Sequence, residues 1–325
     1  MTLLTVSGSP HVQSTQTTKK IMWTVVIALL PALLTSIYYF GIAALNVTLV
    51  SVACCLLFEW LIQKFMLKGS CTISDGSAVI TGMLLAFNLP ANIPLWIVAI
   101  GALVAIGVAK MSFGGLGKNI FNPALVGRVF LFLSFPTQVA MSKWPTPHPL
   151  FGGSTLADAV SGPTPLNKEF LASVLAKGQN IDLWNMFVGA TGGSMGEVCA
   201  LAIIIGGLYM LIRKVISWHI PVAFIGTAFI FSGILWLCDP TKFVNPCYQI
   251  LAGGMMLGAI FMATDMVTSP VTWKGQLIFG AGCGLLTIIF RCFGPMPEGV
   301  SFAILIMNAV TPLIDKGFKP QRFGH

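Results

Sequence analysis

The sequence contains little charge. Aspartate, glutamate, lysine and arginine make up 9% of its 325 residues, whereas 56% are hydrophobic and the mean hydropathy is +0.87. A soluble domain of this length and composition would have to expose large apolar patches to water. The shortage of charge therefore excludes a soluble globular protein and indicates an integral membrane protein with several spans.

The sequence also lacks a basic patch, a cysteine–histidine cluster and a complete phosphate-binding loop. The net charge is +8, but the basic residues stand singly or in pairs between apolar segments, so we expect no nucleic-acid partner. The eight cysteines include no C-x-x-C pair and no histidine at ligand spacing, and no metal ligand is assigned. Lys118 follows a glycine run but precedes Asn119 instead of Ser or Thr, which excludes a P-loop. No residue is assigned a catalytic role.

Apolar segments alternate with short polar ones along most of the chain. One long hydrophilic interval, at about 136–185, separates five such segments from five more. Two of the first five have only about twelve residues, and a helix of that length spans about 18 Å, less than the roughly 30 Å of a hydrocarbon core. These two must be tilted or half-embedded. The expected apolar segments lie at about 21–40, 43–66, 78–89, 93–109, 123–135, 198–212, 216–237, 248–263, 275–290 and 300–314.

The two groups of five segments show weak internal similarity. A shift of 180 residues brings Pro90 onto Pro270 and Leu125 onto Leu305, with the segment ends in step. Because five is an odd number, a genuine repeat must be inverted across the membrane, as in transporters whose broken helices meet near the midplane. We therefore predict an all-α integral membrane protein with about ten transmembrane helices in two inverted five-helix repeats that contain short or broken helices. The breaks are expected near 88–90, 117–122, 268–270 and 297–301.

The distribution of lysine and arginine predicts how the chain is oriented in the membrane. Twelve of the 18 basic residues lie on the side of the N-terminus, five lie on the other side and Arg128 lies within a segment. By the positive-inside rule, both termini face the cytoplasm and the long interval faces outward, toward the periplasm or exterior. The expected organisation is a cytoplasmic N-terminal segment (1–20), a first repeat (21–135), an extracytoplasmic loop (136–185), a second repeat (186–314) and a cytoplasmic tail (315–325).

Four acidic residues stand near the predicted helix breaks. Carboxylates at membrane depth are costly unless they are paired or belong to a pathway, and oxygen ligands suit hard cations such as Na⁺. Each could instead be a helix cap, since Asp and Glu favour helix N-termini. The candidates for a Na⁺ or H⁺ path are Asp75, Glu197, Asp265 and Glu298, and Arg128 could pair with one of them.

The long interval contains the polar stretch Ser161-Gly162-Pro163-Thr164-Pro165-Leu166. Prolines on both sides of Thr164 hold the backbone extended and present its hydroxyl, which can be esterified by the terminal phosphate of a nucleotide. The same stretch is also typical of a surface turn. A second threonine, Thr191, follows Gly189-Ala190 but lacks the Pro-Leu that follows Thr164, and it is typical of a glycine-rich lead-in to a helix.

Several runs together resemble a family of membrane electron-transport subunits. They occur in order over nearly the whole chain and are similar to the D subunit of the Rnf electron-transport complex and to the B subunit of the sodium-pumping NADH:quinone reductase. In that family a threonine within Ser-Gly-Ala-Thr-Pro-Leu carries FMN through a phosphoester. The resemblance assigns this role to Thr164, flanked by Ser161, Gly162 and Pro165, with Pro163 in place of the alanine. The runs are Ser74-Asp75-Gly76-Ser77, Gly114-Gly115-Leu116-Gly117-Lys118, Phe121-Asn122-Pro123-Ala124, Gly192-Gly193-Ser194-Met195-Gly196-Glu197, and Ala263-Thr264-Asp265 with Thr268-Ser269-Pro270.

The resemblance implies a bacterial cytoplasmic-membrane flavoprotein that carries covalent FMN on its outer side and passes electrons within a complex. That complex couples electron transfer between ferredoxin and NAD to the translocation of Na⁺ or H⁺. The implied partners include a second subunit with covalent FMN and iron–sulfur subunits, and the chain alone is expected to catalyse nothing. A noncovalent riboflavin is implied by the relatives, and Arg128 could pair with the FMN phosphate. The alternative is a secondary transporter or channel for a small solute.

Overall fold

The computed structural model describes residues 16–68, 72–139, 144–145, 161–162, 166, 183–189, 192–294 and 298–319. The regular secondary structure of the described residues is helical except for one antiparallel pair of two-residue strands, β1 (Trp144–Pro145) and β2 (Ser161–Gly162). In coarse form, the prediction of a helical membrane protein with long and short apolar helices is confirmed. Five segments are long and apolar enough to cross a membrane: Thr18–Leu67, Leu95–Phe113, His219–Cys238, Trp273–Phe293 and Val300–Gly317.

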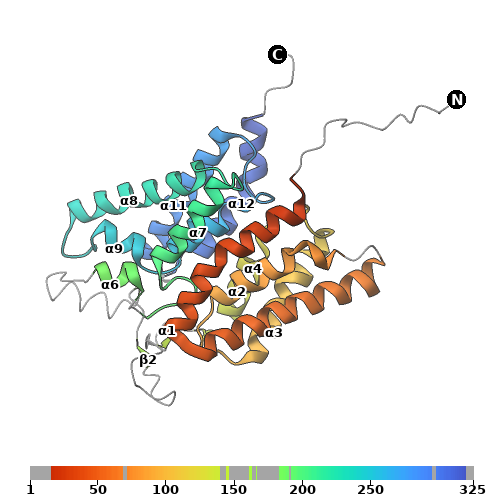
Figure 1. Cartoon of the computed structure of the whole chain (residues 1–325). Helices are drawn as coiled ribbons and strands as arrows, with labels where there is room; N and C mark the ends of the chain where they lie inside the picture. Colours follow the sequence, from red (N-terminus) through yellow and green to blue (C-terminus); the bar gives the residue numbers. More distant parts are fainter. Residues whose placement is uncertain are drawn as a thin grey trace.

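The first of these segments is a helical hairpin. Helix α1 (Thr18–Leu61) continues as the π-helical turn η1 (Ile62–Leu67) and contains one break, at Gly41. The φ of 65° and ψ of −149° at Gly41 are readily adopted only by glycine, so the chain reverses there. Figure 1 shows the two arms, red and orange-red, both extending toward the right of the view from the bend near the α1 label, so the chain runs antiparallel to itself. The 50-residue segment therefore provides two apolar arms.

Short helices complete the first half. Helix α4 (Pro123–Ser134) begins with a cap, because the Asn122 side chain accepts a hydrogen bond from Ala124 N at 3.1 Å and proline occupies the first helical position. The preceding elements are η2 (Ile73–Asp75), α2 (Ser77–Phe87), α3 (Leu95–Leu103), η3 (Val104–Val108) and η4 (Met111–Phe113).

The second half contains one break that the sequence did not predict. The continuous apolar helix expected at 248–263 is wrong, because the chain leaves the helix at Ala252 and Gly253 has a φ of +66°. Glycine adopts this conformation without steric cost, so two short helices form in place of one span. The elements of this half are α6 (Leu183–Val188), α7 (Ala200–Ile212), α8 (His219–Cys238), α9 (Pro246–Leu251), α10 (Met255–Leu257), η5 (Gly258–Met262), α11 (Trp273–Phe293) and α12 (Val300–Gly317).

Glycines set the closest approaches between helices. A Cβ at Gly284 of α11 would lie 2.4 Å from the Phe224 carbonyl oxygen of α8, and a Cβ at Gly206 of α7 would lie 2.1 Å from the Ala28 oxygen of α1. Small residues allow such contacts inside membranes, where van der Waals packing holds helices together. In Figure 1, α7 lies beside the first arm of α1, so this contact joins the two halves.

Candidate functional site

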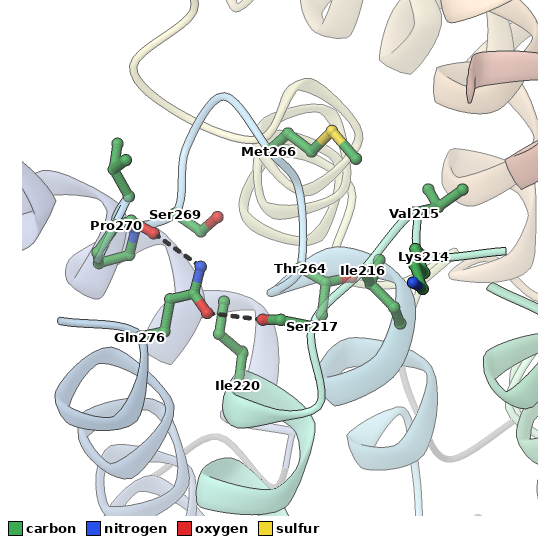
Figure 2. A pocket seen from close by; sticks show the side chains of 11 residues that line it. Lys214, Val215, Ile216, Ser217, Ile220, Thr264, Met266, Ser269, Pro270 and Gln276 are labelled. Carbon is green, nitrogen blue, oxygen red and sulfur yellow. Dashed lines mark hydrogen bonds between the residues drawn. The ribbon is translucent and has the colours of Figure 1, made fainter. Parts of the chain in front are cut away.

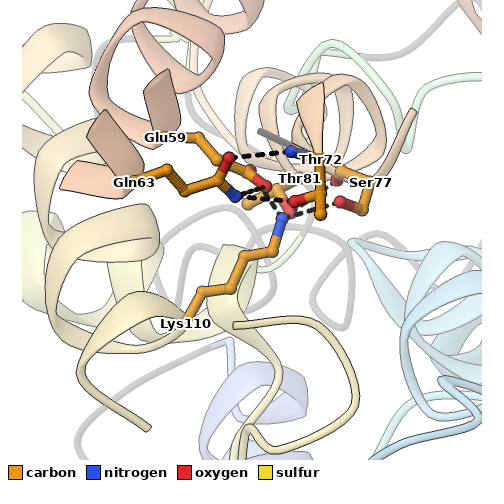
Figure 3. Close-up of polar contacts among 6 residues, drawn as sticks. All are labelled: Glu59, Gln63, Thr72, Ser77, Thr81 and Lys110. Atoms are coloured by element: carbon orange, nitrogen blue, oxygen red, sulfur yellow. Dashed lines mark hydrogen bonds and ion pairs between the residues drawn. The ribbon is translucent and has the colours of Figure 1, made fainter. Parts of the chain in front are cut away.

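A buried ion pair lies where the second arm of α1 meets the end of η3 (Figure 3). Lys110 Nζ is 2.6 Å from Glu59 Oε2, and the two side chains are 2% and 1% exposed. The same ammonium donates to Ser77 Oγ at 2.8 Å, at the first residue of α2. Buried charges persist only when they are paired, so this contact fixes three elements relative to one another.

An amide completes the network around this pair. Gln63 Nε2 donates to Glu59 Oε1 at 3.3 Å and to Thr72 Oγ1 at 2.7 Å, and Gln63 Oε1 accepts from Thr72 N at 2.9 Å. Both carboxylate oxygens of Glu59 therefore have partners. A fully paired polar network of this kind makes the local packing specific.

This network includes residues whose role the sequence-based interpretation missed. Lys110 is one of the twelve basic residues that the positive-inside rule places on the cytoplasmic side, yet it is buried. A usable signal existed, because Glu59 is the single acid within the apolar segment 43–66, and an acid at such a position demands a partner.

Asp265 faces a small cavity next to this network. The cavity measures about 70 Å³ and is lined by apolar side chains together with polar ones, which include Ser77, Lys110 and Asn122. It has room for several water molecules, since one needs roughly 10–15 Å³ of such space. Asp265 Oδ2 accepts from Thr268 Oγ1 at 3.3 Å, and its other oxygen accepts from Val267 N at 3.4 Å.

Asp75 belongs to a different cavity. It ends η2, is partly exposed and lines a space of about 620 Å³ together with Gln63 and Thr72. The four acidic candidates therefore do not form one site. Asp75 and Asp265 line separate cavities, while Glu197 and Glu298 meet elsewhere.

A second buried cluster lies at the breaks before α7 and α12. Arg128 of α4 pairs with Glu298 and donates to Asn88 Oδ1 at 2.5 Å. Arg128 and Glu298 are 4% and 5% exposed, so both charges are removed from water. Of the two partners considered for Arg128, a carboxylate is the one it contacts in the structure.

Two carboxylate oxygens of this cluster converge on Gly254. A Cβ at Gly254 would lie 3.0 Å from Glu197 Oε2 and 3.1 Å from Glu298 Oε1. Both oxygens are buried and have no hydrogen-bond partner among the described residues. The other Glu197 oxygen accepts from Ser194 N at 2.8 Å. The absence of a side chain at position 254 thus leaves two acceptors facing the same small space.

Arg291 is the second cation of this cluster. Its guanidinium donates to the carbonyl oxygens of Gln249 and Ala252, the latter at 2.8 Å, and holds the chain at the unpredicted break. Its buried Nε has no partner within the described part of the chain. A Cβ at Gly253 would lie 3.1 Å from Arg291 Nη2 and 2.5 Å from Leu166 Cδ1.

Leu166 connects this cluster with the polar stretch of the long interval. It is 8% exposed and packs with Tyr248 and Ala252. Upstream, Ser161 and Gly162 pair with β1. Thr164, Pro165 and the alternative Thr191 lie outside the described residues, so their assignment stays a prediction.

Asparagines link the two buried clusters. Asn122, which lines the Asp265 cavity, donates to Met262 O at 3.2 Å. Asn88 Oδ1 accepts from Arg128, and Asn88 Nδ2 lies 3.7 Å from Met262 Sδ. Met262 therefore lies between the two clusters and contacts an asparagine of each.

Comparison with known proteins identifies the family. A model of the NQR2, RnfD, RnfE family matches residues 5–324. The chain is 44% identical over 331 residues to the D subunit of the proton-translocating ferredoxin:NAD⁺ oxidoreductase complex of Clostridium ljungdahlii, covering 99% of this chain and 96% of that protein. It is 43% identical over 323 residues to the D subunit of the Na⁺-translocating ferredoxin:NAD⁺ oxidoreductase complex of Acetobacterium woodii, covering 99% and 95%. It is 37% identical over 351 residues to the D subunit of the ion-translocating oxidoreductase complex of Pectobacterium atrosepticum, covering 98% of each. Over nearly its whole length, this chain belongs to the NQR2, RnfD, RnfE family.

Proposed function

We propose that this chain is the membrane subunit of a bacterial complex that couples electron transfer between ferredoxin and NAD⁺ to ion translocation. The observation that carries the proposal is the full-length match to relatives named as the D subunit of such complexes. Iron–sulfur subunits and a second flavin-bearing subunit would supply the other electron-transfer steps. The clostridial relative is named as part of a proton-translocating complex and the acetobacterial relative as part of a Na⁺-translocating one, and the chain is almost equally identical to both. Ion-uptake measurements must therefore distinguish Na⁺ from H⁺.

The chain would carry FMN as a phosphoester on Thr164. When bound, FMN accepts electrons and passes them on. The described surroundings of the motif fit a phosphate, because Leu166 packs beside Arg291, whose buried Nε has no described partner. Arg291 could attract a phosphate in that neighbourhood by charge.

Fluorescence tests the attachment directly. We expect the denatured wild-type chain, from cells that can flavinylate it, to give a band under ultraviolet light on a gel. The band should vanish in Thr164→Val and persist in the matched control Thr191→Val. A dark wild-type band would favour the solute-transporter alternative, whereas loss of the band only in Thr191→Val would move the attachment site. Riboflavin in an acid extract of the same sample tests for the noncovalent flavin.

The ion path would run along the polar groups at the broken helices. Asp265 would supply a carboxylate at the small cavity that Asn122 also lines, and Glu298 and its neighbour Glu197 would supply two more. Met262 lies between the two groups, because it contacts Asn122 through its carbonyl oxygen and Asn88 through its sulfur. Carboxylate and amide oxygens suit Na⁺, and the same groups can relay protons through water. Because Arg128 and Arg291 balance the charge of the glutamates, this part of the path can stay buried.

Asp265→Asn tests this path. We expect the variant complex to retain its FMN and to lose most Na⁺ or H⁺ uptake in vesicles. Asp239→Asn is the matched control, since Asp239 lies at the exposed end of α8 and outside the proposed path. Undiminished uptake in Asp265→Asn at equal flavin content would remove Asp265 from the path.

The two halves would form the inverted repeat, with both termini in the cytoplasm and the long interval outside. The support is a pair of reciprocal contacts made by Arg128 and Asn308, two residues that are 180 positions apart in the sequence. Arg128 of α4 pairs with Glu298, just before α12. When the Asn308 side-chain amide is turned so that both its ends are paired, Asn308 of α12 accepts from the backbone N of Asn122, just before α4, at 3.2 Å. Reporter fusions at the chain ends and at residue 150 test the orientation. An active periplasmic alkaline phosphatase fused to the C-terminus would refute it.

A further inference from the structure

An apolar groove runs between α7 and α8. It measures about 390 Å³ and is lined by aliphatic side chains and two glycines, with Met256 and Ile260 at its floor. Leu208 and Val222 at its edges are 52% and 55% exposed. The groove therefore opens toward the surface that faces lipid or a partner.

A second cavity adjoins the groove at Ile216, which lines both spaces. Its lining is mixed, and it is called the polar cavity because it includes polar side chains, whereas the described lining residues of the groove include none. The cavity measures about 480 Å³, and Figure 2 shows the Lys214, Ser217 and Gln276 side chains among those around it. Gln276 accepts from Ser217 Oγ at 2.6 Å and donates to Pro270 O at 3.2 Å. This amide ties the start of α8, the 264–271 segment and α11 into one wall.

The polar cavity carries positive charge. Lys214 lines it, and Arg213 precedes Lys214 at the exposed end of α7. Lys214 has a φ of +55°, one of only two positive values for non-glycine residues in the described part of the chain. This conformation is costly for lysine at a helix end where glycine is usual, which suggests that the side chain is needed there. The positive-inside rule assigns this end to the cytoplasmic face.

We propose that these two spaces bind one anionic phospholipid of the cytoplasmic leaflet. An acyl chain occupies the apolar groove, and the phosphate lies beside Lys214 in the polar cavity. Basic pockets between membrane helices on the cytoplasmic side suit acidic headgroups. A partner's helix would run the length of α7 and α8, whereas these spaces change from apolar to charged across a single residue, Ile216. An amphiphile with a negatively charged head matches that change.

Lipid titration of the purified full-length chain, followed by native mass spectrometry, tests the charge requirement. We expect phosphatidylglycerol to bind more tightly than phosphatidylcholine. Lys214→Gln should lower the affinity for phosphatidylglycerol about fivefold and leave the affinity for phosphatidylcholine unchanged. A fivefold change corresponds to the roughly 1 kcal/mol that one basic residue near the membrane surface contributes. Lys274→Gln, an exposed lysine on the same predicted face, is the control and should change neither lipid. Equal binding of both lipids by the wild type would overturn the proposal.

Filling the groove tests the acyl-chain site. A Cβ at Gly226 would have no atom within 4 Å, so the side chain of Gly226→Leu begins in open space and extends into the groove. We expect this variant to bind both lipids at least about tenfold more weakly than the wild type. Gly317→Leu adds the same side chain to equally open space at the end of α12 and should have no effect. Unchanged binding in folded Gly226→Leu contradicts the groove assignment, and the Lys214→Gln measurement does not depend on that variant folding.

Photocrosslinking in the intact complex distinguishes the occupants. A photoreactive phenylalanine analogue in place of Val222, which lines the groove and is half-exposed, should yield a lipid adduct. A crosslink to a partner polypeptide instead would show that a protein helix covers the groove and would overturn the proposal.

Discussion

Replacement of Lys110 by methionine should destabilise the chain more than any exposed charge substitution. The ammonium lies 2.6 Å from Glu59 Oε2, at 2% and 1% exposure. At an effective dielectric constant of about 20, the attraction at that distance is roughly 6 kcal/mol, and desolvation of both ions offsets part of it. In Lys110→Met the buried Glu59 keeps only the Gln63 amide at 3.3 Å. An uncompensated buried charge costs about 3–5 kcal/mol, which is the loss we expect.

The double variant separates the ion pair from simple loss of packing. Glu59→Gln alone should also lower the free energy of unfolding, because the buried Lys110 ammonium would lose its carboxylate partner and keep the hydroxyl of Ser77. Glu59→Gln combined with Lys110→Met removes both charges and keeps similar volumes, so it should be more stable than either single variant. We expect a coupling free energy of about 2–4 kcal/mol.

The assay is sodium dodecyl sulfate unfolding of the purified chain in detergent, followed by circular dichroism. Lys242→Met provides the matched control, since Lys242 pairs with Asp239 at 3.1 Å but the side chains are 76% and 31% exposed. Exposed pairs contribute about 0–1 kcal/mol. If Lys110→Met is as mild as Lys242→Met, or if the two single effects simply add in the double variant, the reasoning from burial is refuted.

Two glycine substitutions probe the closest approaches in the fold. Gly206→Val should lower the free energy of unfolding by about 1–3 kcal/mol, because its Cβ would lie 2.1 Å from Ala28 O at the α1–α7 contact. An unfolding curve equal to that of the wild type would contradict this. Gly254→Ala places a methyl group 3.0 Å from Glu197 Oε2 and 3.1 Å from Glu298 Oε1, so we expect reduced ion uptake by the reconstituted complex with FMN content retained. Full ion uptake by the Gly254→Ala complex would show that ions do not use the space between Gly254 and the two glutamate side chains.

Composition was sufficient to predict a helical membrane fold. A chain inside lipid must satisfy its own backbone hydrogen bonds, and helices do so locally, so a long apolar run already implies a helix. The break at Ala252–Gly254 did not follow from the same pattern, because two glycines within an apolar run are compatible with a continuous membrane helix. The break is instead stabilised by Arg291, which donates to carbonyl oxygens about 40 positions earlier in the chain.

The candidate site was predicted only in part, for a related reason. Acidic residues near helix breaks could be found from local sequence, but their partners lie far along the chain. Arg128 and Glu298 are 170 positions apart, and Lys110 and Glu59 are 51 apart. Periodicity and spacing describe neighbours within an element, whereas these pairs form when different helices pack. Thr164 remains a prediction from its motif, because it lies outside the described residues.

The reciprocal contacts between the halves suggest how the chain could couple them. Arg128 and Asn308 stand 180 positions apart, on α4 and α12, and each reaches the break that precedes the other helix. A relative movement of the halves would have to separate both contacts together. The two contacts differ in kind, since Arg128 meets the charged Glu298 whereas Asn308 meets the uncharged backbone of Asn122. A change in charge at Glu298, by a proton or a cation, would therefore alter one contact and leave the other intact. If the proposed ion path includes Glu298, this asymmetry would allow ion binding at that residue to bias the position of one half against the other.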